Sequence, residues 1–411
     1  MSVAKLSVAN VIEAVTGVNK ESVSHPRYKR KRQLLLLVLC ILLLVGGRIA
    51  FRSVAPQLPP GVSRPDFEKA AADFKGEFDR DGDHFDVLMT LAKLSAKKKD
   101  AATAIACYHQ IPTDHVRYGP AARYEEAQLF AETDQVQRAE DSFNEFLKLL
   151  EQGIQLPDRQ VAHSRHWLSL IYGAELRSED RRIVLHDLVE DHQADINDVK
   201  QYYFGSLLIW QTVFGSERVR DFLKKDPDNR NLRVAAARYD IGEGRLKEAR
   251  ERLATLRSED PKDLRTLAVL LESCYEMNDW SAFADAFATA PEFGKDEPWL
   301  LTQLRGEWAL HQNDWLKAEE YFQYMLKIDP PNAVCLMGLA RAYAGQGKPK
   351  EREAMLQRSL LVAKLRVDLS AITHDNPKGA RTVANSARQL GMEDAAGILE
   401  FFAARMPDGT R

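Results

Sequence analysis

The sequence predicts an all-α protein, in which a row of helical hairpins follows one membrane-spanning helix. The hairpins are predicted by a repeated Asp-Pro pair and by small residues that recur twelve positions apart, as Ala237 and Ala249 do. The membrane helix is predicted by the apolar run LLLLVLCILLLVGG at residues 34–47. The Asp-Pro pairs are residues 226–227, 260–261 and 329–330.

Charge is distributed unevenly along the 411 residues. Residues 1–52 hold nine Lys and Arg against two Glu, a net +7, whereas the rest holds 48 basic and 58 acidic residues, a net −10. Because phosphate contacts need a basic surface, the larger part is not expected to bind nucleic acid. The four cysteines are widely scattered and form neither a disulfide framework nor paired C-x-x-C zinc ligands.

The apolar run predicts a single-pass anchor at residues 33–52. Residues 34–47 span about 21 Å as a helix, so the span must extend to include Arg48, whose side chain can reach the headgroups. The basic stretch RYKRKR at 27–32 precedes it. By the positive-inside rule, residues 1–32 form a cytoplasmic N-terminal segment and the rest is extracytoplasmic, which in a bacterium means the periplasmic side of the inner membrane.

A cleaved signal peptide is the alternative interpretation of this run, because the run is short. Two observations favour a retained anchor. The leader before the run is 32 residues long, and the best cleavage site, Ser53-Val54-Ala55, is followed by Pro56. Residues 53–66 are rich in proline and are expected to form a semi-rigid linker between the membrane and the hairpins.

A spacing of 34 residues between the first two Asp-Pro pairs, and of 69 between the second and third, is one and two steps of a single helical hairpin. In residues 306–332, two apolar helix-length stretches flank the polar turn Gln312-Asn313-Asp314. Pro330 disfavours a helical conformation at Asp329 and so ends the second helix, and Asn332 can cap the next one. Two helices of about 12–14 residues and two turns add up to the observed period.

This pattern resembles the tetratricopeptide repeat (TPR), which places small residues at its eighth and twentieth positions. Such residues let the two helices of a hairpin approach closely where they cross. The pairs that carry the resemblance are Ala92/Ala104, Ala127/Ala139, Ala237/Ala249 and Gly306/Ala318. In this register, units begin near residues 85, 120, 162, 196, 230, 264, 299, 333 and 377.

The resemblance implies a right-handed α-solenoid of about nine TPR-like helical hairpins, with residues 67–366 as the solenoid and 367–411 as a C-terminal capping hairpin. Some units are degenerate: Arg181, Glu272 and Arg352 each occupy a position where a small residue is expected, and Tyr203 occupies another. Insertions at 154–161 and 367–376 interrupt the count.

No catalytic, cofactor-binding or metal-binding residues are predicted. The sequence lacks the G-x-x-x-x-G-K-[ST], G-x-S-x-G and H-E-x-x-H motifs. The acidic stretch 79–86 has His84 and Thr90 where a calcium loop needs Gly and Glu, so a linker with a helix cap is preferred. His163, His166, His186 and Glu190 could approach one another, but solvent-facing histidines are commoner than a zinc site.

In arrays of this kind the first helices line a concave groove, which suits an extended or helical protein segment held by several modest contacts. Met89, Lys93, Ala121 and Glu125 occupy the positions of the lysine–asparagine clamp that some TPR proteins use for acidic tails, so that clamp is not predicted. The expected groove residues are Lys93, Tyr124, Gln128, His163, His166, Lys200, Phe204, Arg238, Gln303, Glu307 and Arg341.

The sequence therefore predicts a membrane-tethered, non-enzymatic scaffold that binds protein or peptide partners, with a role in envelope protein assembly or secretion. The alternative from another class is an enzyme subunit or cryptic hydrolase with a site in the degenerate repeats 154–229. A structural oligomer that associates through exposed hairpin faces is the third interpretation.

Overall fold

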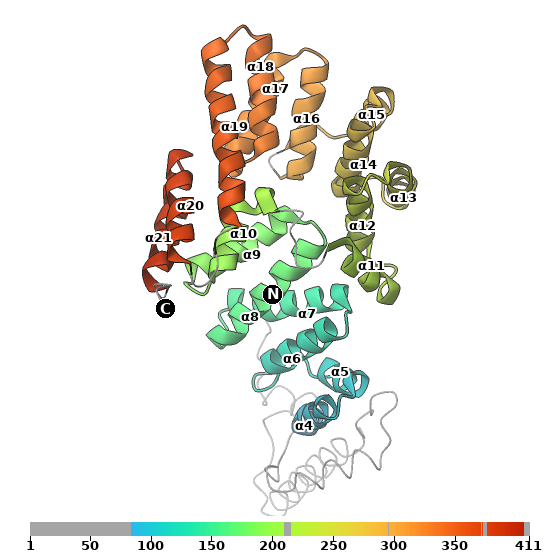
Figure 1. Cartoon of the computed structure of the whole chain (residues 1–411). Coiled ribbons are helices and arrows are strands. Elements are labelled where there is room, and N and C mark those ends of the chain that lie inside the picture. The colour runs from blue at the N-terminus through green and yellow to red at the C-terminus, as the bar shows by residue number, and fades with distance from the viewer. Residues whose placement is uncertain (1–83, 209–214, 295, 371, 373–375, 407–411) are drawn as a thin grey trace, which may run out of the picture. The chain divides into compact units, whose positions relative to one another are not determined.

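The computed structural model describes residues 84–208, 215–294, 296–370, 372 and 376–406. Within these ranges the chain folds into helices α4 to α21 and no strand, which confirms the all-α prediction for this part of the protein (Figure 1). No helix in the described ranges is long and apolar enough to cross a bilayer. The predicted cytoplasmic segment 1–32, anchor 33–52 and linker 53–66 lie outside them.

The helices follow the predicted register closely. The first helices of successive units are α4 (His84–Lys97), α6 (Gly119–Glu132), α8 (Asp158–Ala174), α10 (Ile196–Leu208), α12 (Arg230–Gly242), α14 (Leu264–Glu276), α16 (Trp299–His311), α18 (Ala333–Gly345) and α20 (Pro377–Gln389). The second helices are α5 (Ala101–His109), α7 (Val136–Glu151), α9 (Ser178–Glu190), α11 (Gly215–Lys225), α13 (Leu246–Glu259), α15 (Trp280–Phe287), α17 (Trp315–Ile328), α19 (Pro349–Leu369) and α21 (Glu393–Arg405).

Each hairpin turn within the described ranges contains one residue in the left-handed region, always at the same position of the repeat. Glycine occupies this position in some turns, but Leu176 and Asn313 adopt positive φ angles of 54° and 59°. A residue with a Cβ atom is strained there, so the shared conformation shows that the turns are built alike. The residues are Lys99, Asp134, Leu176, Gly244, Asn278, Asn313, Gly347 and Gly391.

The small residues lie where the helices cross. Ala237 of α12 and Ala249 of α13 are both fully buried. A Cβ atom added at Gly306 or Gly338 would come within 2.6 Å or 2.4 Å of the Phe322 ring, so the absence of a side chain at both glycines lets this ring fit between α16 and α18. Close packing of this kind fixes the distance between neighbouring hairpins.

Residues at the helix ends also act as predicted. α17 ends at Ile328, directly before Asp329-Pro330, because the residue before proline avoids the helical region. The Asn332 side chain accepts a hydrogen bond of 3.0 Å from the Cys335 backbone N–H at the start of α18. This cap satisfies one of the free N–H groups of the helix.

Eight of the nine units pack as hairpins, first helix against second, within the described residues. The fourth unit differs. α11 packs on α12, whereas α10 packs on α9 and also on α19 and α21, which follow it by more than 140 residues (Figure 1). α10 has a non-helical kink at Phe204, with φ −130° and ψ 23°. A simple row of hairpins, in which each unit touches only its neighbours, therefore does not describe this protein.

The contacts of α10 close a circuit of helices. α9 packs on α10, α10 on α19, α19 on α18, and α18 on α16. Glu179 of α9 returns to α16, where its carboxylate accepts a 2.6 Å hydrogen bond from the Trp299 backbone N–H. We call α9, α10, α16, α18 and α19 the helix circuit.

A single apolar core holds the circuit closed. It joins Phe204 and Leu207 of α10 to side chains of α19 and of the C-terminal pair α20 and α21, including the fully buried Leu365 and Leu399. Burying side chains of this size stabilises the fold by about 1.5–3 kcal/mol each. The capping hairpin thus covers α10 as well as the end of α19.

Candidate functional site

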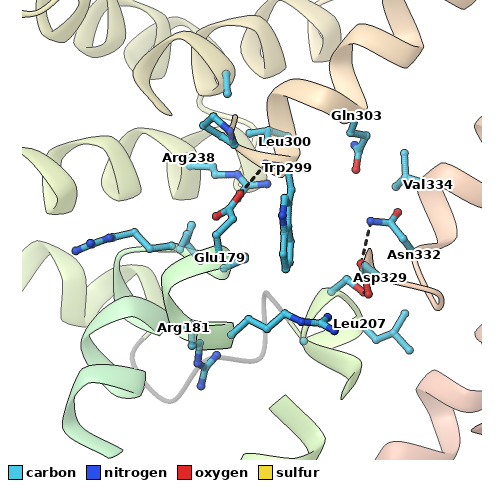
Figure 2. A pocket seen from close by; sticks show the side chains of 18 of the residues that line it. Glu179, Arg181, Leu207, Arg238, Trp299, Leu300, Gln303, Asp329, Asn332 and Val334 are labelled. Atoms are coloured by element: carbon cyan, nitrogen blue, oxygen red, sulfur yellow. Dashed lines mark hydrogen bonds between the residues drawn. The ribbon is translucent and has the colours of Figure 1, made fainter. Parts of the chain in front are cut away.

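The helix circuit encloses a cavity of about 880 Å³. Its wall is completed by the end of α8 and by α12 and α14, so helices from most of the chain contribute to it. Figure 2 shows Trp299 in the cavity, with Glu179 on one side and the corner that carries Asp329 and Asn332 on the other. Six arginines and five carboxylates are among the lining residues.

Several of the charged side chains in the wall are paired. Arg238 of α12 donates to both carboxylate oxygens of Glu272 on α14, at 2.9 and 3.1 Å. Arg265 forms an ion pair with Asp180. Arg177 donates to Glu175 at 2.9 Å, and to two further carboxylates. These pairs connect neighbouring helices and neutralise one another.

Arg181 of α9 is the exception among the buried charges of the wall. Its Nε donates to the Ser169 hydroxyl at 3.3 Å and its Nη1 to the Gln201 side-chain carbonyl at 2.9 Å. Both partners are neutral, and no carboxylate of the described residues lies within ion-pair distance of Arg181. Burial lowers the pKa of Arg181 to about 10, although the more distant Asp198 opposes this. The guanidinium therefore keeps its charge at neutral pH.

Arg182 is the next residue on α9. Its guanidinium lies 5.0 Å from the ring centre of Tyr202 on α10 and 5.8 Å from that of Trp299 on α16. A cation over an aromatic face is attracted by the ring electrons, by about 0.5–2 kcal/mol depending on exposure. No hydrogen bond or ion pair joins Arg182 to another described residue.

Two of the lining carboxylates are deeply buried. Burial raises the pKa of Asp329, which accepts hydrogen bonds from Ser206 at 3.1 Å and from Asn332 at 3.1 Å. Burial also raises the pKa of Glu175 to about 7, and one of its two oxygens has no hydrogen-bond partner. The cavity therefore holds carboxylates whose negative charge is disfavoured as well as an unpaired positive charge.

Five of the predicted groove residues lie on the first three first helices. The Tyr124 hydroxyl of α6 lies 2.9 Å from Nδ1 of His163 on α8, and Gln128 lies 3.3 Å from the same atom. His166 pairs with Asp198 at 3.3 Å, and this hydrogen bond raises its pKa. Lys93 of α4 is exposed, whereas Tyr124 is almost completely buried. Lys93, Gln128, His163 and His166 form what we call the first-helix surface.

The other six lie in the second half of the array. Arg238 and Gln303 line the cavity. Lys200 donates to the Ile372 carbonyl at 3.3 Å. Glu307 is buried and forms an ion pair with Arg341. Phe204 is completely buried, because the kink in α10 turns it into the core shared with α19 to α21, so it offers no surface to a partner.

The structure places no catalytic triad in the described part of 154–229. Hydrogen bonds connect His163 to Tyr124 and Gln128, His166 lies against Asp198, and Ser164 donates to a backbone carbonyl. Within the described ranges no group of three or more His, Cys, Asp or Glu side chains could hold a metal ion. Most of the acidic stretch 79–86 lies outside those ranges.

The predicted groove omitted the residues that now stand out in the cavity. Arg181 carried a signal in the sequence, because it replaces the small residue expected where two helices cross, and Ser169 occupies the matching position on α8. Arg182, Trp299 and Arg366 carried none, since each fits an ordinary helical position. Their convergence depends on the contact of α10 with α19.

One comparison with known families gives a match. A tetratricopeptide repeat model matches residues 309–366, from the end of α16 to the last turn of α19. None of the curated proteins matches the sequence.

Solved structures that resemble this chain include Cut9–Hcn1 of the APC/C, a tetratricopeptide repeat protein from Parabacteroides merdae and the TPR domain of P58(IPK). For Cut9–Hcn1 the identity is 12%, the TM-score 0.35, and the match covers 83% of this chain and 78% of that one. The corresponding values are 15%, 0.30, 64% and 99% for the P. merdae protein. They are 14%, 0.29, 80% and 95% for P58(IPK). Scores this low carry no argument about arrangement or function.

Proposed function

We propose that this protein is a membrane-tethered scaffold that binds a protein partner along the first-helix surface. The tetratricopeptide repeat at 309–366 supports a role in protein interaction. The observation that carries the proposal is the direct contact between successive first helices, where Tyr124 of α6 meets His163 of α8. This contact places Gln128, His163 and His166 on one surface, and the exposed Lys93 lies on the preceding first helix.

The composition of this surface suits a peptide or a partner helix. The ring of His163 meets Trp167 edge-on, with ring centres 6.2 Å apart, and both side chains are partly exposed. Rigid aromatic groups with polar tips supply contact area at low entropic cost, and the charges of Lys93 and His166 supply orientation. Several modest contacts spread over three helices are typical of extended-segment recognition.

The apolar run at 33–52 supports the tether. An anchored scaffold searches only the membrane surface, which raises the effective concentration of any partner held at the same membrane. The basic residues at 27–32 favour a cytoplasmic N-terminus and an extracytoplasmic, in a bacterium periplasmic, array of hairpins. A role in envelope protein assembly or secretion fits this placement.

Site-specific photo-crosslinking of the full-length chain in native membranes tests the partner surface. A photoreactive amino acid replaces Gln128 on the first-helix surface, or Lys148 on the exposed side of α7 as the matched control. The proposal expects a discrete crosslinked partner from position 128, absent from position 148 and lost when Lys93→Glu and His163→Ala are added. Equal products from both positions would reject the first-helix surface.

The tether has a test of its own. The mass of the mature protein, extracted from membranes with detergent, is expected to include residues 1–52. Recovery of a shortened chain from the aqueous fraction would show that the apolar run is a cleaved signal, and would leave the partner surface to be judged by the crosslinking.

A further inference from the structure

Arg181 occupies an unusual position for a buried charge. Desolvating an ionised group is costly unless a counter-charge or strong hydrogen bonds replace its water. Other arginines in the cavity wall satisfy this rule, because Arg177, Arg238 and Arg265 each contact a carboxylate. Arg181 has only Ser169 and Gln201, two neutral partners, and its remaining N–H groups have none among the described residues.

The guanidinium of Arg181 is also held firmly in place. A Cβ atom at Gly173 would lie 3.0 Å from its Cζ atom, so the group rests directly on the backbone of α8. Its two hydrogen bonds tie it to α8 and α10. A fixed, desolvated cation is preorganised to receive an anion, because little side-chain entropy is lost on binding.

Two further arginines line the same cavity without a carboxylate partner among the described residues. Arg182 adjoins Arg181 on α9 and lies against Tyr202 and Trp299. Arg366, on α19, is exposed. These three guanidinium groups come from two helices of the circuit, which allows them to face one occupant from different directions.

The lining carboxylates do not neutralise this site. Glu175 and Glu272 are held by Arg177 and Arg238, and Glu179 accepts the Trp299 backbone N–H. Asp329 is buried against Ser206 and Asn332, near enough to Arg182 to feel its field but outside ion-pair distance. Glu276, on the exposed side of α14, forms no hydrogen bond or ion pair in the described residues.

The size and enclosure of the cavity favour a small occupant. Sites for small molecules commonly measure about 300–1,000 Å³ and are lined by apolar and aromatic side chains with a few convergent polar groups. The cavity of about 880 Å³ fits this description, with Trp299, Tyr202 and Tyr275 in its wall. Because α10 is packed against α19, a polypeptide segment would have to thread through the helix circuit, whereas a small molecule needs only an opening of its own width.

We propose that this cavity binds a small organic molecule that carries a carboxylate or phosphate group. Arg181 and Arg182 hold the anionic group, and Trp299 supplies an aromatic face for the rest of the molecule. Guanidinium groups suit both anions, because their N–H donors form paired, charge-assisted hydrogen bonds with planar or tetrahedral oxygens. This ligand site is separate from the first-helix surface and does not depend on a protein partner there.

Binding of simple anions to the full-length protein in detergent tests the proposal. Citrate and inorganic phosphate serve as probes for the two head groups, each compared with sodium chloride at equal ionic strength. Thermal unfolding and titration calorimetry provide the readouts. An acidic peptide of alternating Glu and Gly is the third probe.

The variants are Arg181→Gln, Arg182→Gln and the matched control Arg233→Gln, whose arginine pairs with Glu259 on α13 and does not line the cavity. Arg182 has no hydrogen bond to lose, so its variant keeps the test valid even if Arg181→Gln unfolds. The expected result is that citrate, phosphate or both raise the unfolding temperature of the wild type and of Arg233→Gln. Either cavity variant should weaken binding at least tenfold, and the stronger of the two probes identifies the head group.

Three outcomes would overturn the proposal. Neither citrate nor phosphate stabilises the wild type beyond the chloride control, or both stabilise the Arg182→Gln variant as much as the wild type. In the third, only the acidic peptide binds and Arg182→Gln abolishes its binding, which would make the cavity a protein-segment site.

Discussion

The Ser206 hydroxyl of α10 donates a 3.1 Å hydrogen bond to the Asp329 carboxylate, although 123 residues separate the two along the chain. Lys200, two turns earlier on α10, reaches the Ile372 carbonyl across 172 residues. Repeat arrays are normally stabilised by contacts between neighbouring units. In this protein one helix of a degenerate unit instead joins the middle of the array to its C-terminal hairpins, and this contact creates the cavity.

Replacing Phe204 with alanine should destabilise the protein strongly. The side chain is fully buried in the core shared by α10 and α19 to α21, and removal of such a ring typically costs about 3–5 kcal/mol. Urea unfolding followed by circular dichroism measures the change. Gln303→Ala, a partly exposed position in the cavity wall, should change the midpoint little, and a similarly small effect for Phe204→Ala would place the ring outside the core.

Gly306→Ala should lower stability by about 1–3 kcal/mol, because the new methyl group would overlap the Phe322 ring at 2.6 Å. A smaller side chain at position 322 should relieve this overlap. The double variant Gly306→Ala/Phe322→Leu is therefore expected to lose less than the sum of its single variants in thermal unfolding. Strict additivity would mean that the two side chains do not meet.

Two glycines separate backbone strain from packing. Gly244 has a φ angle of +80° and Gly397 lies on the exposed side of α21; a Cβ atom at either would meet nothing within 4 Å. Gly244→Ala should cost about 1–2 kcal/mol, because an L-residue is strained in the left-handed region. Gly397→Ala should instead stabilise the protein by about 0.5–1 kcal/mol, since alanine favours the helix. Thermal shifts of the same sign would contradict the turn geometry.

The stability of the protein should depend on pH through Glu175. Burial raises its pKa from 4.5 to about 7 in the folded protein. Between these values the unfolded chain ionises first, so the folded state binds more protons and stability falls as pH rises, by on the order of 3 kcal/mol in total. The loss is absent below pH 4.5 and complete above pH 7.

Urea midpoints measured at pH 5 and pH 7.5 for the wild type and Glu175→Gln check this dependence. The glutamine variant cannot ionise, so its midpoint should change less over the interval than that of the wild type. Parallel changes in the two proteins would show that Glu175 titrates normally.

The local structure could be predicted from the sequence because its determinants are close together in the chain. Ala237 and Ala249 specify one helix crossing, and Asp329-Pro330 with Asn332 specifies one helix end. The closure of the circuit could not be predicted in this way, since a contact between Lys200 and Ile372 leaves no periodic pattern. Phe204 was assigned to the groove on the assumption of a regular helix, and the kink at that residue turns it into the core instead.

The cavity residues divide along the same line. Arg238 and Gln303 were predicted to face inward because they occupy regular positions of regular first helices, and both line the cavity. Trp299 and Arg182 meet only because α9, α10 and α16 converge. The substitution of Arg181 for a small residue was visible in the sequence, but its two neutral partners were not.

Distance measurement by pulsed electron paramagnetic resonance tests the closed circuit most directly. Spin labels at Glu190→Cys on α9 and Asp394→Cys on α21, both exposed, flank Tyr203, whose pKa is raised by burial and by both of these carboxylates among other charges. Cys40 is replaced by serine, and the other three cysteines are buried. The circuit predicts one short, narrow distance distribution. A broad distribution at long distance, as in an open row of hairpins, would contradict it.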